Sequence, residues 1–169
     1  YWIVRTGMGL ENAKHAAGRV LAHQPFCLAV STGFACALIA VDVGALLAGY
    51  EVALARGQGA DVLPMSTVPG IERDVVVELV KHVEPSGHVG RFVSTDRVVT
   101  SATEKRRFAQ TTGAIGLDME SAALAAEAQK AQVPFVVVRA VSDLVDEDLP
   151  LDFNLFLRPT GWIKGVAAI

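Results

Sequence analysis

The amino-acid sequence predicts a three-layer α/β/α fold with a central, mostly parallel sheet. Two segments carry this prediction. Residues 133–143, "VPFVVVRAVSD", concentrate branched and aromatic apolar side chains, which is typical of a strand in a sheet covered by helices on both faces. Residues 1–23 predict a strand, a turn at Gly7-Met8-Gly9 and a helix, a unit from which α/β folds are built.

The other predicted elements follow from local patterns along the chain. The strand at 1–5 precedes a helix at 11–23, where small and branched apolar residues recur at helical spacing. Residues 26–30 predict a strand buried on both faces, bounded by Pro25 and by a loop of small residues. Residues 44–48 and 51–55 predict two strands, although a helix is also compatible with their alanine and leucine content. A loop is predicted at 57–70, followed by an amphipathic helix at 71–83 with Ile71, Val75, Val76, Leu79 and Val80 on one face. The last predicted elements are a strand at 88–94, a short polar helix at 102–110 and a helix from Met119. No linker composition divides the chain, so residues 1–169 are expected to form one domain.

Charge and composition exclude several classes of function. A net charge of -3 provides no basic field for nucleic acid, and the basic cluster Lys105-Arg106-Arg107 beside Glu104 is expected to be a solvated helix face. Cys27 and Cys36 lie in apolar surroundings without a partner motif, which indicates two small buried thiols in a reducing compartment. No metal-ligand spacing links the four histidines, His15, His23, His82 and His88. We therefore expect no metal and no cofactor.

The uncharged residues 26–41 are too short and too interrupted to cross a membrane. Spans need about 20 apolar residues, whereas Ser31, Thr32 and Gly33 interrupt this run and Asp42 ends it. The first residues, "YWIVRTGMG", also lack the basic head and apolar core of an export signal. These features predict a cytoplasmic protein.

Ser142 and Asp143 lie where the most apolar strand ends. Ligands gather at the carboxyl ends of strands in parallel sheets, and a partly desolvated carboxyl there can act as a general acid because burial disfavours its charged form. An acid after a strand is also a common turn former or helix cap. Position alone leaves both interpretations of Asp143 open.

The stretch 116–128, "GLDMESAALAAEA", places two acids at the start of a plain alanine helix. Asp118 can cap this helix, and the negative charge of Glu120 can interact favourably with the positive N-terminal end of the helix dipole. Each interaction contributes about 0.5–1 kcal/mol of helix stability. That account needs no ligand, but it leaves Arg139, a cation within the apolar strand, without a counter-charge. We expect one of the two acids to pair with Arg139 and the other to face the ligand crevice.

Two segments of small residues are candidate ligand loops. Gly7-Met8-Gly9 lies where a phosphate cradle could form, but Asn12 stands at the position of the third glycine of the dinucleotide fingerprint. The second segment follows the strand at 26–30 and is either a close packing contact or a ligand-contacting backbone. Its candidate pocket residues are Thr32, Gly33, Phe34 and Ala35.

These segments together resemble the nucleoside phosphorylase and nucleosidase superfamily, in particular the bacterial methylthioadenosine/S-adenosylhomocysteine nucleosidases and the hopanoid-associated phosphorylases. The similarity covers nearly the whole chain, from "TGMGLENA" and "STGFACAL" through "DVGALLAGYEVA" and "GRFVSTDRVVTSATEKRRF" to "GLDMESAALAAEA" and "VPFVVVRAVSDLVDEDLPLDF". The last two blocks are the most specific, because the family carries a Met-Glu pair at a helix start and an Arg-Ala-(Ile or Val)-Ser-Asp strand end. The resemblance implies a mixed, twisted central sheet.

The resemblance also implies cleavage of the N-glycosidic bond between adenine and a ribose, without a cofactor. Asp143 would protonate N7 of the purine, with Ser142 holding its carboxyl. Glu120 would accept hydrogen bonds from the ribose hydroxyls, and Met119 would pack against the sugar. Asp118 is then expected to cap the helix or to form the ion pair with Arg139. Val98 and Val99 would line the base pocket, and a backbone group of Val145 would contact the purine.

Four features depart from the family pattern. In the family, an acid from the loop after the first strand positions the attacking water, and the similarity here begins at the family's second strand, so no residue matches that acid. Leu28 stands where many phosphorylases place a phosphate-binding arginine, which favours hydrolysis. Val98 replaces an aromatic residue that stacks on adenine, and Cys36 replaces a glycine.

The expected activity is therefore hydrolytic release of adenine from a 5'-substituted adenosine. One alternative is a phosphorylase that uses phosphate, including one that acts on adenosylhopane. Another is a nucleoside-binding domain with weak catalysis. Because members of the family commonly assemble and the chain is apolar, we expect a homodimer or a larger homo-oligomer.

Overall fold

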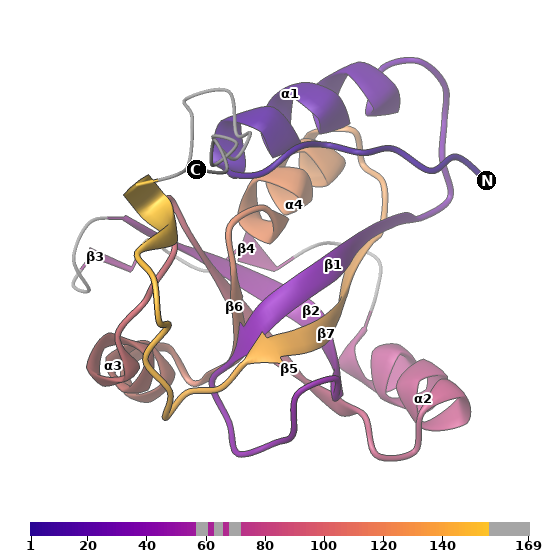
Figure 1. The fold of residues 1–169 in the computed structure, drawn as a ribbon. Coiled ribbons are helices and arrows are strands. Elements are labelled where there is room, and N and C mark those ends of the chain that lie inside the picture. The colour runs from indigo at the N-terminus through magenta and orange to yellow at the C-terminus, as the bar shows by residue number, and fades with distance from the viewer. Residues whose placement is uncertain (57–60, 63–65, 68–71, 156–169) are drawn as a thin grey trace, which may run out of the picture.

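The computed structural model describes residues 1–56, 61–62, 66–67 and 72–155, which form a twisted sheet with helices on both sides (Figure 1). Helices α1 (Leu10–Leu21) and α4 (Ser121–Lys130) lie together on one side of the strands, and α2 (Arg73–Val83) and α3 (Ala102–Thr112) lie on the other. The other elements are β1 (Ala29–Ala37), β2 (Leu46–Arg56), β3 (Asp61–Val62), β4 (Ser66–Thr67), β5 (His88–Thr95), β6 (Ala114–Asp118), β7 (Phe135–Asp143) and the 3₁₀ turn η1 (Phe153–Leu155). The predicted α/β class with a central mixed sheet is confirmed.

The two longest ladders of the sheet are parallel. They join β1 to β7 and β2 to β5. β6 lies parallel to β5 and antiparallel to the end of β1, whereas β7 also runs antiparallel to the first residues of β2. Cys36 at the end of β1 pairs with Leu117 of β6 and with Asp143 of β7. The carboxyl ends of three strands therefore meet at Cys36.

The fully buried ring of Phe92 in β5 limits the size of the residues next to it on the neighbouring strands. A Cβ atom at Gly49 would lie 2.5 Å from the Phe92 ring, and one at Gly116 would also lie 2.5 Å from it. Helix α4 packs its alanines into the same cluster. Phe108 of α3 packs into a second cluster with residues of β1, β2, β5 and β6. The glycines beside the Phe92 ring and the alanines of α4 leave room for this helix to pack close to the strands.

Four strand predictions, at 1–5, 26–30, 44–48 and 51–55, were wrong in their bounds or type. Residues 1–5 are exposed and form no strand, since an apolar segment becomes a strand only where another strand pairs with its backbone. The segment with Thr32, Gly33, Phe34 and Ala35 is no loop but continues β1, because its backbone pairs with β7 as far as Cys36. The strand predicted at 26–30 begins only at Ala29 and is not buried on both faces, since Val30 is 51% exposed. The segments at 44–48 and 51–55 belong to the single strand β2.

The helix predictions hold in type and differ at their edges. α4 begins at Ser121 rather than at Met119. In α2, Val76 and Val80 are buried, but Val75 and Leu79 are exposed, so the predicted apolar face is only half covered. Ile71 and most of the predicted loop at 57–70 lie outside the described residues, and β3 and β4 occupy the described parts of that loop. No helix in the described part of the chain is long and apolar enough to cross a membrane.

The two cysteines are both free, as predicted, but only one is buried. Cys36 lies in the cluster around Phe108, whereas Cys27 is exposed in the connection before β1. The prediction of burial was therefore wrong for Cys27, because the apolar run that contains it begins before the paired part of the strand.

Candidate functional site

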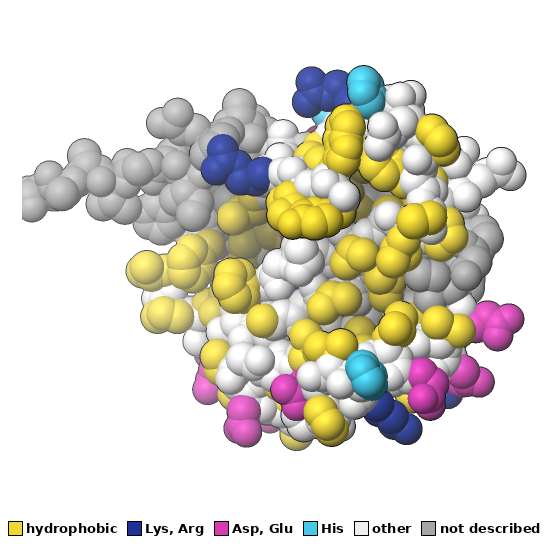
Figure 2. Space-filling model, turned by 90° about the vertical axis from the view of Figure 1, so that its right-hand side faces the viewer, with side chains coloured by type: hydrophobic (Ala, Val, Ile, Leu, Met, Phe, Trp, Pro, Cys, Tyr) yellow, Lys and Arg dark blue, Asp and Glu magenta, His cyan; other side chains and the backbone are white. Residues whose placement is uncertain are grey.

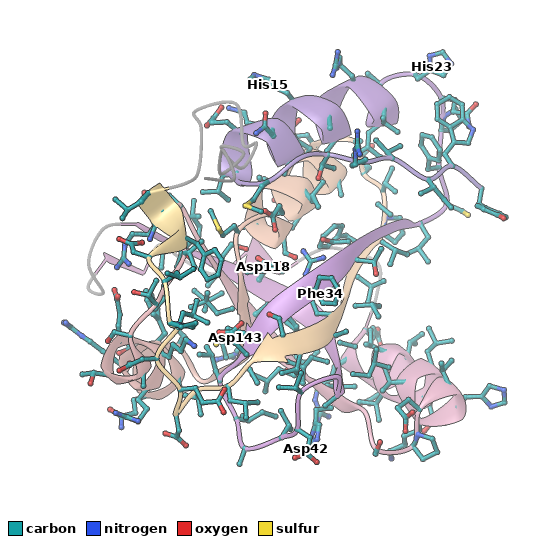
Figure 3. All side chains as sticks on the ribbon, viewed as in Figure 1. His15, His23, Phe34, Asp42, Asp118 and Asp143 are labelled. Atoms are coloured by element: carbon teal, nitrogen blue, oxygen red, sulfur yellow. The ribbon has the colours of Figure 1, made fainter. Side chains whose placement is uncertain are left out.

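A small cavity of about 190 Å³ lies where the carboxyl ends of the strands meet. It is lined by the ends of β1, β6 and β7, by residues that follow β5 and by single residues of two loops. These residues are Met8, Phe34, Ala35, Cys36, Val98, Val99, Leu117, Asp118, Met119, Glu120, Ser142, Asp143 and Leu149. Figure 3 shows Phe34, Asp118 and Asp143 grouped at these strand ends, with His15 and His23 well away from them.

A larger, open cleft of about 900 Å³ adjoins the small cavity. Its walls are the N-terminal segment, α1, the first part of β1 and the neighbouring side of α4, and its lining is mostly apolar. Met8, Phe34 and Glu120 line both cavities. In Figure 2, hydrophobic side chains gather over one face of the molecule, and acidic side chains lie along its lower edge.

Most of the predicted site residues come together in the small cavity. Thr32 and Gly33 line the larger cleft instead. Val145 lines neither cavity, and its side chain packs against the cluster around Phe108. The residues that the structure gathers in the small cavity as the sequence predicted are Phe34, Ala35, Val98, Val99, Met119, Glu120, Ser142 and Asp143.

Arg139 and Asp118 form a buried ion pair, the pairing expected for the cation of the apolar strand. Nε and Nη2 of Arg139 donate to Oδ2 of Asp118 at 3.0 and 2.7 Å, and the two side chains are 3% and 1% exposed. Nη2 also donates to the hydroxyl groups of Ser31 and Ser121, each at 2.9 Å. These hydrogen bonds offset the cost of removing both charges from water.

Asp118 also orders the turn that presents Glu120. Its Oδ1 accepts hydrogen bonds from the backbone N–H groups of Glu120 and Ser121 at 3.3 and 3.2 Å, and from the Ser94 hydroxyl at 2.5 Å. Asp118 therefore caps the start of α4 and pairs with Arg139 at the same time. The carboxylate of Glu120 takes no part in that network and is available at the junction of the two cavities.

Burial raises the pKa of the Glu120 carboxyl above its ordinary value of 4.5, and the nearby Asp118 carboxylate raises it further. The backbone N–H of Gly9 donates to Oε1 of Glu120 at 2.7 Å and opposes this effect. The turn at Gly7-Met8-Gly9 thus contacts the Glu120 carboxylate. A desolvated carboxylate in this position is a strong acceptor for hydroxyl groups of a ligand.

Asp143 is held on both carboxylate oxygens. Nζ of Lys105 lies 2.7 Å from Oδ2, and the Ser142 hydroxyl lies 2.7 Å from Oδ1 and 3.2 Å from the carbonyl oxygen of Ala35. The Asp143 side chain is 17% exposed, toward the small cavity that it lines. Burial and the Asp143 carboxylate both raise the pKa of the neighbouring Cys36 thiol, which therefore stays neutral.

The prediction of a solvated face at 105–107 was wrong for Lys105, whose side chain is 0% exposed, and right for Arg106 and Arg107. A signal for this burial is present in the sequence. Lys105 stands three residues after Ala102 and three before Phe108, both buried, so it lies on the inner face of α3.

The wall of the small cavity next to Val98 is held by residues that the sequence did not single out. The side chain of Asn154 accepts from the backbone N–H of Val98 at 2.8 Å and donates to its carbonyl oxygen at 2.9 Å. The N–H of Leu149 donates to the carbonyl of Thr100 at 2.8 Å. The chain after β7 thereby closes this side of the cavity. No local sequence pattern marks Asn154 or Leu149 as site residues, because both lie far along the chain from Val98 and Thr100.

The donor set of the small cavity is suited to acid–base chemistry. It combines a carboxyl held by a cation and a hydroxyl, a second carboxylate with a raised pKa, and apolar walls formed by Val98, Val99 and Phe34. Among the described residues, no group of three or more His, Cys, Asp or Glu side chains could hold a metal ion. Such a cavity can place a proton on a flat, weakly basic ligand and bind adjoining hydroxyl groups.

Comparisons of the sequence with a family profile and with known proteins point to the same family. The sequence profile described as the phosphorylase superfamily matches residues 1–158. A 5'-methylthioadenosine/S-adenosylhomocysteine nucleosidase of Staphylococcus aureus (strain bovine RF122 / ET3-1) is 30% identical over 170 residues, which cover 92% of this chain and 74% of the relative.

Solved structures agree with this result. A 5'-methylthioadenosine/S-adenosylhomocysteine nucleosidase from Neisseria meningitidis, in complex with methylthio-immucillin-A, matches with a TM-score of 0.73 and 25% identity over 92% of this chain and 73% of its own. An S-adenosylhomocysteine nucleosidase from Streptococcus pyogenes, in complex with 5-methylthiotubericidin, matches with a TM-score of 0.70 and 20% identity over 83% of this chain and 66% of its own. At that identity the second match supports the fold alone.

Proposed function

The chain belongs to the phosphorylase superfamily, and on that premise we propose that it is a nucleosidase that releases adenine from a 5'-substituted adenosine by hydrolysis. The observation that carries the proposal is the meeting of Asp143, Glu120 and two valines in one cavity at the carboxyl ends of the strands. The relatives named above are nucleosidases of 5'-methylthioadenosine and S-adenosylhomocysteine, which supports the same class of substrate.

The two cavities suggest how a nucleoside would lie. The small one, of about 190 Å³, is below the range of roughly 300–1,000 Å³ of complete small-molecule sites, so it suits the base alone. Glu120 lines both cavities, so the ribose hydroxyls would lie at their junction. The 5' substituent would then enter the larger, apolar cleft beside Phe34.

The residues of the small cavity supply the charges that the reaction needs. Breaking the glycosidic bond leaves electrons on the base and positive charge on the sugar. Asp143 would give its proton to N7 of the purine, with Ser142 fixing the orientation of the carboxyl. Glu120 would accept hydrogen bonds from the ribose hydroxyls while Met119 packs against the sugar. Water would add to the anomeric carbon and lose a proton to solvent.

The proposal is tested by supplying 5'-methylthioadenosine or S-adenosylhomocysteine and measuring free adenine, with and without phosphate. We expect a free sugar product and a rate that does not depend on phosphate. Asp143→Asn should reduce release by about 100-fold or more while the fold is retained, because a positioned acid contributes about 10²–10⁴-fold. Adenine binding without release from either nucleoside would contradict hydrolysis and favour a nucleoside-binding domain with weak catalysis.

A second candidate is a phosphorylase that acts on an adenosine with a hopanoid at its 5' end. The volume and apolar lining of the larger cleft favour a bulky apolar substituent. Formation of a sugar 1-phosphate, and loss of release when phosphate is removed, would support this candidate against hydrolysis. The leucine at position 28, which lines the cleft, favours hydrolysis because it provides no charge for phosphate.

The proposal includes a homodimer or larger homo-oligomer in the cytoplasm. Exposed apolar side chains in the N-terminal segment and in β1, among them Trp2, Ile3 and Val30, support assembly. Light scattering after size-exclusion chromatography tests the oligomeric state. A monomer at micromolar concentration would contradict it.

A further inference from the structure

Lys105 is a fully buried cation whose three N–H groups are all used. Its Nζ donates to Oδ2 of Asp143 at 2.7 Å, to the carbonyl of Leu144 at 3.1 Å and to the carbonyl of Glu147 at 2.9 Å. The side chain is 0% exposed. Removing an ammonium group from water carries a cost of several kcal/mol, so a lysine here needs a function that an apolar residue of the same length would not serve.

The fold already holds α3 to the loop after β7 without Lys105. Oδ1 of Asp148 accepts from the backbone N–H of Ala102 at 2.6 Å, and Arg106 pairs with Asp146 at 2.9 Å. These contacts lie at the first turn and on the outer surface of α3, where the side chains of Arg106 and Asp146 are 46% and 73% exposed. Lys105, in contrast, extends past this loop and contacts the carboxyl group of Asp143 beside the small cavity.

Lys105 approaches Asp143 from the interior. It is not part of the lining of the small cavity, whereas Asp143 and Ser142 are. Oδ2 is therefore anchored on the protein side, and Oδ1, beside the Ser142 hydroxyl, is the oxygen that a ligand can reach. Because Cys36 stays neutral, the Asp143 carboxyl is the acidic group that this ammonium faces.

We infer that Lys105 is a positioning residue for Asp143, which fixes the carboxyl toward a bound purine and stabilises the carboxylate formed when its proton leaves. The inference rests on the proposed function. In the reaction the O–H bond of Asp143 breaks as the N7–H bond forms, and the carboxyl gains a negative charge 2.7 Å from the ammonium. The interaction is thus stronger after proton transfer than before it, which is the condition for accelerating the chemical step.

The test compares neutral and charged replacements of Lys105 with a matched surface control. Lys105→Met and Lys105→Gln should lower kcat for adenine release by about 100-fold, because loss of one preorganised donor costs about 10²–10³-fold. KM should change by less than about threefold, because the affected interaction strengthens only in the transition state. Lys105→Arg keeps the cation and should retain at least about a tenth of kcat. Arg106→Met, the control on the next residue of α3, should leave kcat and KM unchanged.

Thermal unfolding of each variant separates positioning from a structural role. A neutral variant that keeps the melting temperature and kcat of the natural chain would overturn the inference. So would a failure of both neutral variants to fold, because the ammonium would then be needed by the fold rather than by Asp143. Equal loss of kcat in Lys105→Arg and Lys105→Met would also overturn it, because charge would not matter.

Adenine binding by calorimetry keeps this inference separate from the proposed function. If the natural chain binds adenine but releases none, hydrolysis is wrong, and the effect of Lys105 is then measured on binding. Free adenine carries its own proton and meets Asp143 as a carboxylate, the form that the ammonium stabilises. Lys105→Met should therefore weaken adenine binding by about tenfold, and Lys105→Arg should not. If the natural chain neither binds adenine nor releases it, the function and the inference both fail.

Discussion

Glu120→Gln removes one charge at the junction of the two cavities and changes the volume of the side chain very little. The Glu120 carboxylate accepts a hydrogen bond from Gly9 at 2.7 Å, and in the proposed complex it also accepts from two ribose hydroxyls. Hydrogen bonds to a charged group contribute about 1.5–3 kcal/mol each. Weakening both ribose contacts therefore costs about 3–6 kcal/mol at most, which corresponds to a fall of about 10²–10⁴-fold in kcat/KM.

The same substitution should not lower stability at neutral pH. The folded chain raises the pKa of Glu120 above 4.5, so it binds this proton more tightly than the unfolded chain does. The free energy of unfolding then falls as the pH rises through the window above 4.5, because the native state must ionise a buried carboxyl. The amide variant does not titrate. Its melting temperature relative to the natural chain should therefore rise between pH 4 and pH 7.

Adenine release from methylthioadenosine and thermal unfolding at the two pH values measure these effects. Glu127→Gln is the matched control on α4, because the Glu127 carboxylate bonds only to Lys130 among the contacts described for it and lies outside both cavities. The acid limb of kcat/KM for the natural chain should also lie above pH 4.5, since ribose binding needs ionised Glu120. If Glu120→Gln keeps most of its activity, or unfolds far more easily at pH 7, Glu120 serves the fold and the proposed role is wrong.

Three further predictions test the surroundings of the site. Asp118→Asn leaves the buried Arg139 without a counter-charge and should cost about 3–5 kcal/mol, seen as a lower urea midpoint; a shift below about 0.5 M would contradict this, given slopes of about 1–3 kcal/mol/M. Gly49→Ala brings a Cβ atom to 2.5 Å from Phe92 and should cost about 1–3 kcal/mol. Phe92→Leu in the same chain should recover part of that cost, whereas strictly additive losses would argue against the clash. Asn154→Ala removes two hydrogen bonds to the backbone of Val98 and should raise KM by up to about tenfold with little change in kcat; an unchanged KM would show that this wall does not contact the base.

The fold class follows from patterns that are local in the sequence. The apolar run of β7 and the helical spacing of α1 predict a covered sheet without knowledge of any contact. Prediction failed for residues 1–5 and for the length of β1, because a strand exists only where a second backbone pairs with it. Small residues at 31–35 indicate a loop, but the parallel neighbour β7 extends the strand through them.

The candidate site divides in the same way. Asp143 at the end of β7 and Glu120 at the start of α4 are identified by position in their own elements and by the resemblance that the motifs carry. Val145 lies just beyond β7, where a side chain can turn either toward the cavity or toward α3, and the structure shows that it packs on the α3 side. A contact between its backbone and the base stays a prediction. Asn154 and Leu149 have no motif and reach the site only through the path of the chain after β7.

Local sequence patterns decide which segments are helices and strands and which acids stand at their ends, because these depend on residues a few positions apart. The tertiary structure decides which charge meets which. Arg139 meets Asp118 rather than Glu120, and Lys105 turns inward to Asp143 although the next two residues, Arg106 and Arg107, are exposed. Partners such as these are separated by 21 and 38 positions. Their pairing depends on how distant strands and helices pack, and the low polarity around them then makes each pairing energetically decisive.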